Sequence, residues 1–200
     1  MALIKYNDNS ISAITTAGQL ASGGMVLISE QTASSSSTVD FTSGIDSTYP
    51  IYKFEFINIH PATDDVDLTF QVDTGTNTNY NQTITSTYFQ SRHDEGDTDT
   101  QLAYNTGNDL AQSTSFQKLS QSLANENDAC LSGYLHIFNP SSSTFVKHFI
   151  ARTQQMTDSD FSFDLHIAGY FNLTTALTRF QFKFDSGNID SGDILLYGVN

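Results

Sequence analysis

A period of two in the hydrophobic pattern is the feature that most restricts the fold of this chain. Successive side chains of a β-strand point to opposite faces, so alternation of apolar and polar residues marks a strand with one buried face. Near the C-terminus, Phe180, Phe182 and Phe184 alternate with Arg179, Gln181 and Lys183. In the segment 161–168, Phe, Leu or Ile stands at every odd position. The pattern predicts half-buried strands of antiparallel sheets.

Two further segments in the first half of the chain alternate in the same way. They are Ile51 to His60 and Asp65 to Asp73, joined by a short stretch that contains Pro61. Because proline cannot donate to a sheet ladder, this stretch is expected to be a turn, and the two strands are expected to form a hairpin. The residues predicted to face inward are Tyr52, Phe54, Phe56, Val66, Leu68, Phe70 and Val72; those predicted to face outward are Lys53, Glu55, Asp65, Asp67, Thr69 and Gln71.

Weaker strand signals and turn-rich joints fill much of the remaining chain from Gly24 onward. The weaker strands are expected at Met25 to Ala33, Thr38 to Thr42, Gln82 to Gln90, Leu131 to Asn139 and Phe145 to Thr153, and a last strand at Asp193 to Val199. About eight to ten strands in one chain of this length are typical of a sandwich. The sequence therefore predicts an all-β fold, a jelly-roll-like antiparallel β-sandwich with one short helix or long loop insertion.

The insertion is expected at Asn108 to Asn125, a segment rich in Ala, Gln, Leu and Ser. Phe116, Leu119 and Leu123 have helical spacing, which favours a short helix that caps one end of the sandwich. Ser and Asn weaken this interpretation because their side chains compete for backbone hydrogen bonds, so a long polar loop is the alternative.

The first residues differ from the rest, since a few aliphatic side chains are scattered among Asn, Asp, Ser, Thr and Gly. We expect residues 1–24 to form an N-terminal arm or attachment segment that orders against a partner, and residues 25–200 to form the sandwich domain. The alternative is an ordinary first strand followed by a loop.

Charge and composition limit the partners of the chain. The 22 acidic and 8 basic residues give a formal net charge of −14, which repels nucleic acid and anionic lipid. No stretch reaches the roughly 18 apolar residues of a membrane span, and Met1 to Tyr6 lacks the apolar core of a secretory signal. Cys130 is the single cysteine, so the chain cannot form an internal disulfide. We therefore expect no nucleic acid, no membrane, and synthesis in a cytoplasm.

One acidic loop is a weak candidate for a metal site. Asp94, Glu95, Asp97 and Asp99 offer oxygen ligands of the kind that Ca²⁺ prefers, in a loop that contains Gly96. The spacing differs from that of an EF-hand loop, and no glutamate follows at the bidentate position. A solvated acidic loop is the favoured interpretation.

Catalytic motifs are lacking, so we expect no enzymatic activity and no cofactor. No histidine pair has the spacing of a metal motif, and the sequence contains no nucleophile elbow or phosphate-binding loop. Tyr80, Tyr88 and Tyr104, in or near turn-rich segments, are candidates for stacking on sugar rings, although tyrosines in loops more often pack locally. The histidines are His60, His93, His136, His148 and His166.

The two ends of the chain resemble small virion structural proteins of tailed phages from marine and aquatic environments. The likeness rests on the opening Met1-Ala2-Leu3-Ile4-Lys5-Tyr6 with Asn9-Ser10-Ile11-Ser12 and Gly24-Met25-Val26-Leu27-Ile28, and on the closing Phe182-Lys183-Phe184-Asp185-Ser186-Gly187-Asn188-Ile189 with Ser191-Gly192 and Leu196-Tyr197-Gly198. These signatures are more specific for a phage particle than for a position on it.

The resemblance implies a jelly-roll-like protein that is attached to a virion in several copies. Its partners would be the major capsid protein or other virion proteins, and we expect a capsid decoration protein or a short head fibre that forms a homo-oligomer, with a trimer favoured. The alternative is a carbohydrate-binding or receptor-binding module of a tail fibre, whose partner would be a host surface glycan.

Overall fold

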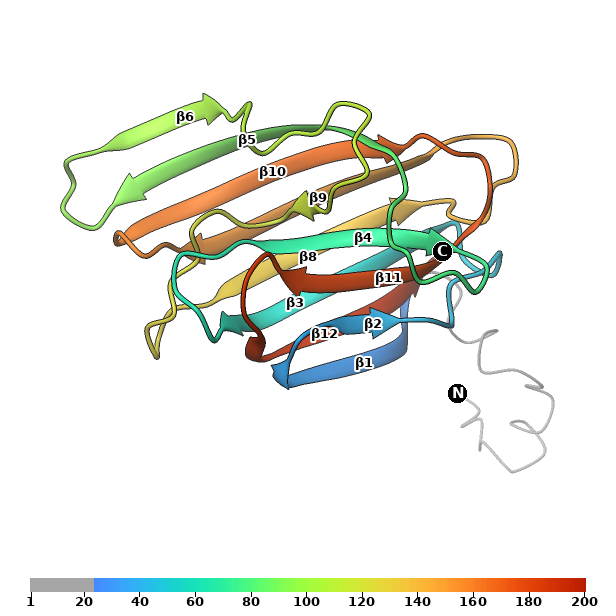
Figure 1. The fold of residues 1–200 in the computed structure, drawn as a ribbon, viewed down its shortest axis with the longest axis horizontal. Helices are drawn as coiled ribbons and strands as arrows, with labels where there is room; N and C mark the ends of the chain where they lie inside the picture. The colour runs from blue at the N-terminus through green and yellow to red at the C-terminus, as the bar shows by residue number, and fades with distance from the viewer. Residues whose placement is uncertain (1–23) are drawn as a thin grey trace, which may run out of the picture.

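The computed structural model describes residues 24–200, which form two antiparallel sheets packed as a sandwich (Figure 1). The eight-stranded sheet contains, in spatial order, β1 (Met25–Ser36), β12 (Ile189–Val199), β3 (Ile51–Pro61), β8 (Leu131–Phe138), β9 (Lys147–Met156), β10 (Phe161–Phe171), β5 (Ile84–Asp94) and β6 (Thr100–Tyr104). The four-stranded sheet contains β2 (Val39–Phe41), β11 (Leu177–Phe184), β4 (Leu68–Thr74) and β7 (Gln117–Lys118). The predicted all-β sandwich is confirmed, while the jelly-roll connectivity stays a prediction.

Aromatic rings from both sheets fill the space between them. Phe182 of the smaller sheet lies with its ring centroid 5.0 Å from that of Phe54 and 5.4 Å from that of Phe56, both in the larger sheet. Phe70 contacts Phe149 at 5.3 Å in the same manner. Most of these pairs are edge-to-face, the geometry that the ring quadrupole favours. The predicted inward rings therefore form the contact that holds the two layers together.

The predicted hairpin of the two central segments is wrong. β3 pairs with β12 and β8 in the larger sheet, whereas β4 pairs with β11 and β7 in the smaller one. The turn after Pro61 therefore carries the chain across the core from one sheet to the other. Alternation identified the buried face of each strand correctly, but it does not specify which strand lies alongside.

The outward side of β4 is also buried, contrary to prediction. Thr69, Gln71 and Asp73 are at most 3% exposed, and Asp67 just before the strand is 7% exposed. Gln71 Nε2 donates toward the backbone oxygens of three loop residues. They are Gln82 at 2.9 Å, Ser115 at 3.1 Å and Thr114 at 3.3 Å. Loops distant in sequence thus cover the smaller sheet, and polar side chains satisfy their backbone groups.

Residues 108–125 contain no helix, so the helical interpretation is wrong and the loop alternative holds. Gln112 and Ser122 have positive φ, which an α-helix does not accommodate. The backbone instead binds strand ends: Leu119 N donates to Leu68 O at 2.7 Å, and Leu123 N donates to Val66 O at 2.9 Å. Leu119 and Leu123 are buried. Their apolar character therefore indicated burial of the loop and not an α-helix.

The predicted last strand, Asp193 to Val199, is confirmed, but β12 already begins at Ile189, within the predicted loop. It lies between β1 and β3. β1 begins at Met25, where the sandwich domain is expected to start. The expected arm lies outside the described residues, apart from Gly24. Residues 24–200 contain no helix that is long and apolar enough to cross a membrane.

Candidate functional site

The larger sheet has one side turned away from the smaller sheet, which we call the outer face. Ile150 at its centre is 47% exposed and Phe89 is 40% exposed. On the central strands its residues are Ile51, Lys53, Glu55, Ser132, Tyr134, His136, Phe138, His148, Ile150, Arg152, Gln154, Ser162, Asp164, His166, Ala168, Tyr170, Thr85, Thr87, Phe89, Ser91 and His93. Large apolar side chains in such contact with solvent mark a face that can bind another surface.

An apolar patch occupies the outer face where β1 begins. Cross-strand pairing places Met25 opposite Val199, Val199 opposite Ile51, and Ile51 opposite Phe138. In the next row, Leu27 is opposite Tyr197. Met25 and Leu27 are each 50% exposed, and the other residues are partly buried. We call this patch the apolar corner; its members are Met25, Leu27, Ile51, Phe138, Tyr197 and Val199.

A shallow depression, which we call the central hollow, lies over β8, β9, β10 and β5. One part has a volume of about 230 Å³, and its lining includes Phe89, Tyr134, Ile150 and His166. A second part of about 340 Å³ shares Tyr134 and Arg152 with the first and adds Asp164. Ala168 lines the first part between larger neighbours, and its small side chain leaves room above the sheet.

An ion pair forms the polar side of the central hollow. Arg152 Nε and Nη2 donate to the two carboxylate oxygens of Asp164 at 2.9 Å and 2.8 Å. This bidentate contact holds the pKa of the Asp164 carboxyl below its usual value, so the carboxylate is ionised at neutral pH. His166 Nε2 lies 3.4 Å from Asp164, and its ring stacks on Phe89 with centroids 4.8 Å apart.

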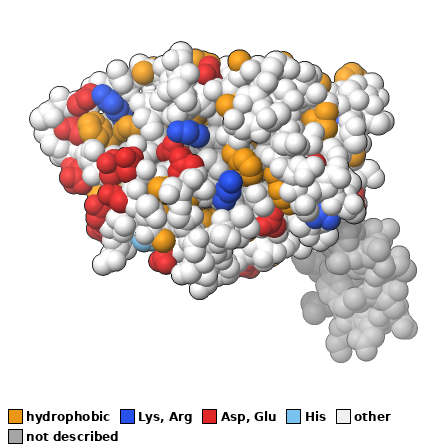
Figure 2. All heavy atoms as spheres, viewed as in Figure 1, with side chains coloured by type: hydrophobic (Ala, Val, Ile, Leu, Met, Phe, Trp, Pro, Cys, Tyr) orange, Lys and Arg blue, Asp and Glu red, His pale blue; other side chains and the backbone are white. Residues whose placement is uncertain are grey.

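Charge on this part of the outer face is balanced, although the whole chain carries −14. The outer-face charges on β3, β8, β9 and β10 are those of Lys53, Glu55, Arg152 and Asp164. Lys53 Nζ pairs with Glu55 at 2.5 Å, and Arg152 pairs with Asp164. The opposite side, seen in Figure 2, shows mainly backbone and side chains that are neither charged nor hydrophobic, and many of its carboxylates lie toward the end that holds the β5–β6 turn. The outer face can therefore approach another acidic protein at little electrostatic cost.

Four of the five histidines lie on the outer face, although their spacing in the sequence gave no sign that they would lie on one surface. They are His93, His136, His148 and His166. His136 packs against the Tyr134 ring at 4.9 Å, and partial burial together with the nearby Lys53 lowers its pKa. Within residues 24–200, no group of three or more His, Cys, Asp or Glu side chains is placed to hold a metal ion.

The acidic loop forms the tight turn between β5 and β6. The Asp94 carboxylate accepts hydrogen bonds from Thr98 N at 2.8 Å, Asp99 N at 2.7 Å and the Thr98 hydroxyl at 2.6 Å. These bonds lower the pKa of Asp94 to about 2. Asp99 pairs with Arg92 at 2.7 Å, and Asp97 lies 3.1 Å from His93. Asp94, Asp97 and Asp99 thus stabilise the turn, whereas the Glu95 backbone N–H donates to Asp160 O, between β9 and β10, at 3.1 Å. The metal interpretation stays a weak prediction.

A separate hollow of about 420 Å³ brings His60, Cys130 and Asp190 to one lining. The two imidazole nitrogens of His60 face other groups, since Nε2 lies 3.1 Å from Glu126 O and Nδ1 lies 3.6 Å from Asp190. Burial raises the pKa of the Cys130 thiol, whose Sγ lies 3.8 Å from the Asn58 amide oxygen. This hollow therefore does not have the activated thiolate that nucleophilic catalysis requires.

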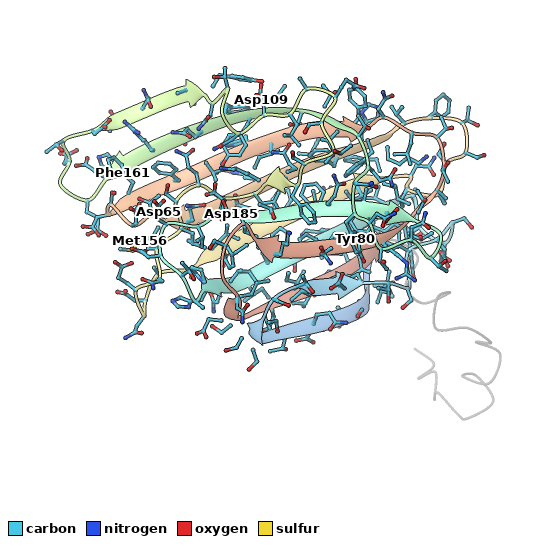
Figure 3. The ribbon with its side chains drawn as sticks, viewed as in Figure 1. Asp65, Tyr80, Asp109, Met156, Phe161 and Asp185 are labelled. Carbon is cyan, nitrogen blue, oxygen red and sulfur yellow. The ribbon has the colours of Figure 1, made fainter. Side chains whose placement is uncertain are left out.

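The tyrosines proposed from sequence for sugar stacking are mostly inaccessible. Tyr80 is 5% exposed and Tyr88 is 0% exposed. In Figure 3 the label of Tyr80 lies well away from that of Asp65, toward the other end of the sandwich. Tyr104 is 51% exposed, but it lies on β6 and donates its hydroxyl to Asp109 at 2.6 Å. The rings of the central hollow, the exposed Phe89 and the partly buried Tyr134, were missed. The sequence did contain a signal for Phe89: it follows Tyr88 in a strand, so its side chain points to the face opposite that of Tyr88.

Comparisons of the chain with protein-family models, with curated proteins and with solved structures find no match in any of the three. The outer face, with its apolar corner and its central hollow, is the candidate functional site that the residues themselves define.

Proposed function

We propose that this chain is a non-catalytic structural protein of a phage particle, made in the host cytoplasm and assembled onto the virion. In this role it binds the major capsid protein or another virion protein through the apolar corner. It acts as a capsid decoration protein or a short head fibre and needs no cofactor. The resemblance of its two ends to virion proteins of tailed phages gives the context, and the apolar corner supports a binding role.

The apolar corner carries the proposal. Met25 and Leu27 are half exposed and lie in register with partly buried apolar residues of β12, β3 and β8. Covering such side chains stabilises a contact by about 25 cal/mol for each Å² removed from water. A patch of this size gives a modest affinity for one copy. Many copies on one particle would raise the total affinity through multivalency, which suits a protein that reinforces a capsid.

The position of the corner agrees with an N-terminal attachment segment. Met25 is the first residue of β1, so the segment 1–24 joins the domain at the apolar corner itself. Lys5 is the only charged residue of the segment besides Asp8, which keeps its charge balanced.

Co-sedimentation with particles that lack the protein tests the proposal. The wild-type chain should sediment with such particles, and the double variant Met25→Ser/Leu27→Ser should bind at least tenfold more weakly. The matched control is Leu102→Ser, because Leu102 is 76% exposed on β6 at the other edge of the same sheet. Control binding should equal wild-type binding. Equal binding of the double variant, or no binding of the wild-type chain, contradicts the proposal.

Heat resistance provides a second, independent measurement. A decoration protein bridges capsid subunits and raises the temperature at which particles lose infectivity. Particles that lack the chain should therefore inactivate at a lower temperature, and adding the purified chain should restore resistance. Unchanged inactivation with and without the chain would rule out a reinforcing role.

A further inference from the structure

The central hollow differs in chemistry from the apolar corner, since it combines aromatic rings with an ordered set of polar groups. Phe89, Tyr134 and His166 line it, and Ile150 contributes an aliphatic surface between them. Polar groups lie at fixed positions because Arg152 and Asp164 hold one another through two hydrogen bonds. Apolar ring faces next to positioned donors and acceptors are the arrangement that a small polar ligand with an apolar side requires.

We infer that the central hollow binds a neutral hexose unit of a surface polysaccharide. The C–H groups of a pyranose ring pack on aromatic rings, and Phe89 and Tyr134 supply such rings. Each ring has one side against a histidine, His166 and His136 respectively, and Phe89 is 40% exposed. Its hydroxyl groups both donate and accept hydrogen bonds. Arg152 Nη1 and the Tyr134 hydroxyl take no part in the hydrogen bonds found among residues 24–200, and the Thr87 hydroxyl at the rim retains acceptor capacity.

Charge favours a neutral sugar over an acidic one. The cation that lines the hollow, Arg152, already pairs with Asp164, so the pair presents dipoles rather than net positive charge. The whole chain carries −14, which repels polyanions such as uronic acid polymers. A neutral hexose avoids both the repulsion and the cost of breaking the ion pair.

The location of the hollow favours a sugar over a peptide. Peptides that extend a sheet bind at an edge strand, where backbone groups are unpaired. The central hollow lies over β8, β9, β10 and β5, all of which have neighbours on both sides. These strands therefore offer side chains instead of a backbone ladder. The two parts, of about 230 Å³ and 340 Å³, are also small for a folded partner and suit one or two sugar rings.

This site is separate from the apolar corner and does not depend on the proposed attachment to a capsid. The two regions share no residue, and each can be changed alone. A chain that is held on a particle and also binds sugar would bring the particle to a polysaccharide-coated surface, with many weak sites acting together.

Titration followed by NMR tests the inference on the full chain labelled with ¹⁵N. The probes are linear trisaccharides of glucose, mannose and galactose, and the trisaccharide of galacturonic acid as the anionic comparison. At least one neutral trisaccharide should give saturable shift changes of the amide signals of Thr87, Phe89, Tyr134 and Arg152. The anionic trisaccharide should bind at least tenfold more weakly than the best neutral one.

Four variants identify the site. Tyr134→Ala and Phe89→Ala should each weaken binding tenfold or more, while Tyr134→Phe should retain most of it because the ring remains. Tyr170→Ala is the matched control, since Tyr170 lies on the outer face of β10 but does not line the hollow. The spectrum of each variant without sugar shows that it folds. The Met25→Ser/Leu27→Ser variant should bind sugar as the wild type does, which separates this site from capsid attachment.

Three results overturn the inference. One is the absence of saturable binding to all three neutral trisaccharides. Another is binding that survives both Tyr134→Ala and Phe89→Ala. The third is preference for the anionic trisaccharide, which would assign the hollow to an acidic ligand instead.

Discussion

Phe182 packs among aromatic rings that come from both sheets. Its ring contacts those of Phe41, Phe54, Phe56 and Phe70, with centroids between 5.0 Å and 6.2 Å away. These four rings come from strands of both sheets, and all are at most 2% exposed. Removing the central ring leaves a cavity that its neighbours cannot fill without moving the sheets together.

Phe182→Ala should therefore lower the free energy of unfolding by about 3–5 kcal/mol, the usual cost of such a truncation in a core. Urea denaturation measures this value. Phe145→Ala is the control, because Phe145 is 70% exposed and its loss should change stability by less than about 0.5 kcal/mol. Similar losses in both variants would show that Phe182 is not central to the packing.

The turn between β5 and β6 should be sensitive to acid through Asp94. The pKa of this carboxyl is about 2 in the folded chain, against 3.8 for the free group. A lowered pKa means that the ionised carboxylate stabilises the turn above pH 3.8, and that this contribution is lost as the pH falls through about 2. The amide signals of Thr98 and Asp99, whose N–H groups bind Asp94, should shift in NMR spectra with a midpoint near that value.

Two variants check the assignment of this acid sensitivity. Asp94→Ala should abolish the transition and increase hydrogen exchange in the turn. Glu95→Ala removes a neighbouring charge that makes no such turn contact, and should leave the transition in place. Loss of the transition in Glu95→Ala, or its persistence in Asp94→Ala, would contradict the role given to Asp94.

At the residue scale, sequence alternation predicted the inward rings correctly, including those of β3, β4 and β11. It failed for Asp67, Thr69 and Gln71, which are polar and nevertheless buried. Their burial depends on loops that fold back from distant parts of the chain, and alternation describes one strand only. Asp67 illustrates the compensation: burial raises its pKa, while Lys118 Nζ pairs with it at 2.5 Å.

Among the elements, the loops that cover the smaller sheet depend on Gln71. Its side-chain amide donates toward three backbone oxygens, one in residue 82 and two in residues 114 and 115. The loop at 108–125, which was expected to form a helix, is thus held against the smaller sheet by the side chain of Gln71.

Gln71→Ala should destabilise the fold by about 1–3 kcal/mol, because it leaves buried carbonyl groups without donors. Hydrogen exchange should quicken most at Ser113 and Ser115 and little in β9. Gln181→Ala is the control: Gln181 lies on the neighbouring strand β11, is partly exposed and bonds Asp40 at 2.8 Å. An equal or larger effect in the control would show that Gln71 does not hold the loops.

Strands with clear alternation could be located from sequence, while their partners could not. The weaker strands were also found, but β6 and β7 were missed, since Thr100–Tyr104 and Gln117–Lys118 are too short or too irregular to show a period. The β3–β4 hairpin was wrong because a short turn can join neighbours in one sheet or cross between two. The central hollow needs the pairing of four strands, so it could not be predicted from any one segment.

For the whole molecule, charge distribution and assembly are linked. Copies of a chain with net charge −14 repel one another, and this repulsion is weakest where charge is locally balanced, as it is on the outer face of β3, β8, β9 and β10. Symmetric closure then limits the number of copies, and a trimer is the predicted form.

Static light scattering on the purified chain measures this number directly. The prediction is a mass three times that of the 22.0 kDa chain. A trimer held by apolar contacts should not dissociate when the salt concentration is raised. A mass of one chain at all concentrations would remove self-association from the proposed role.

The apolar corner of the larger sheet is proposed to hold this protein to a virus particle. An averaged electron microscopy image of the intact particle tests it most directly. We expect density for the sandwich on the particle surface, with the start of β1 and the apolar corner against a capsid or other virion protein. Particles without such density, or density in which the smaller sheet makes the contact and the apolar corner faces solvent, would contradict it.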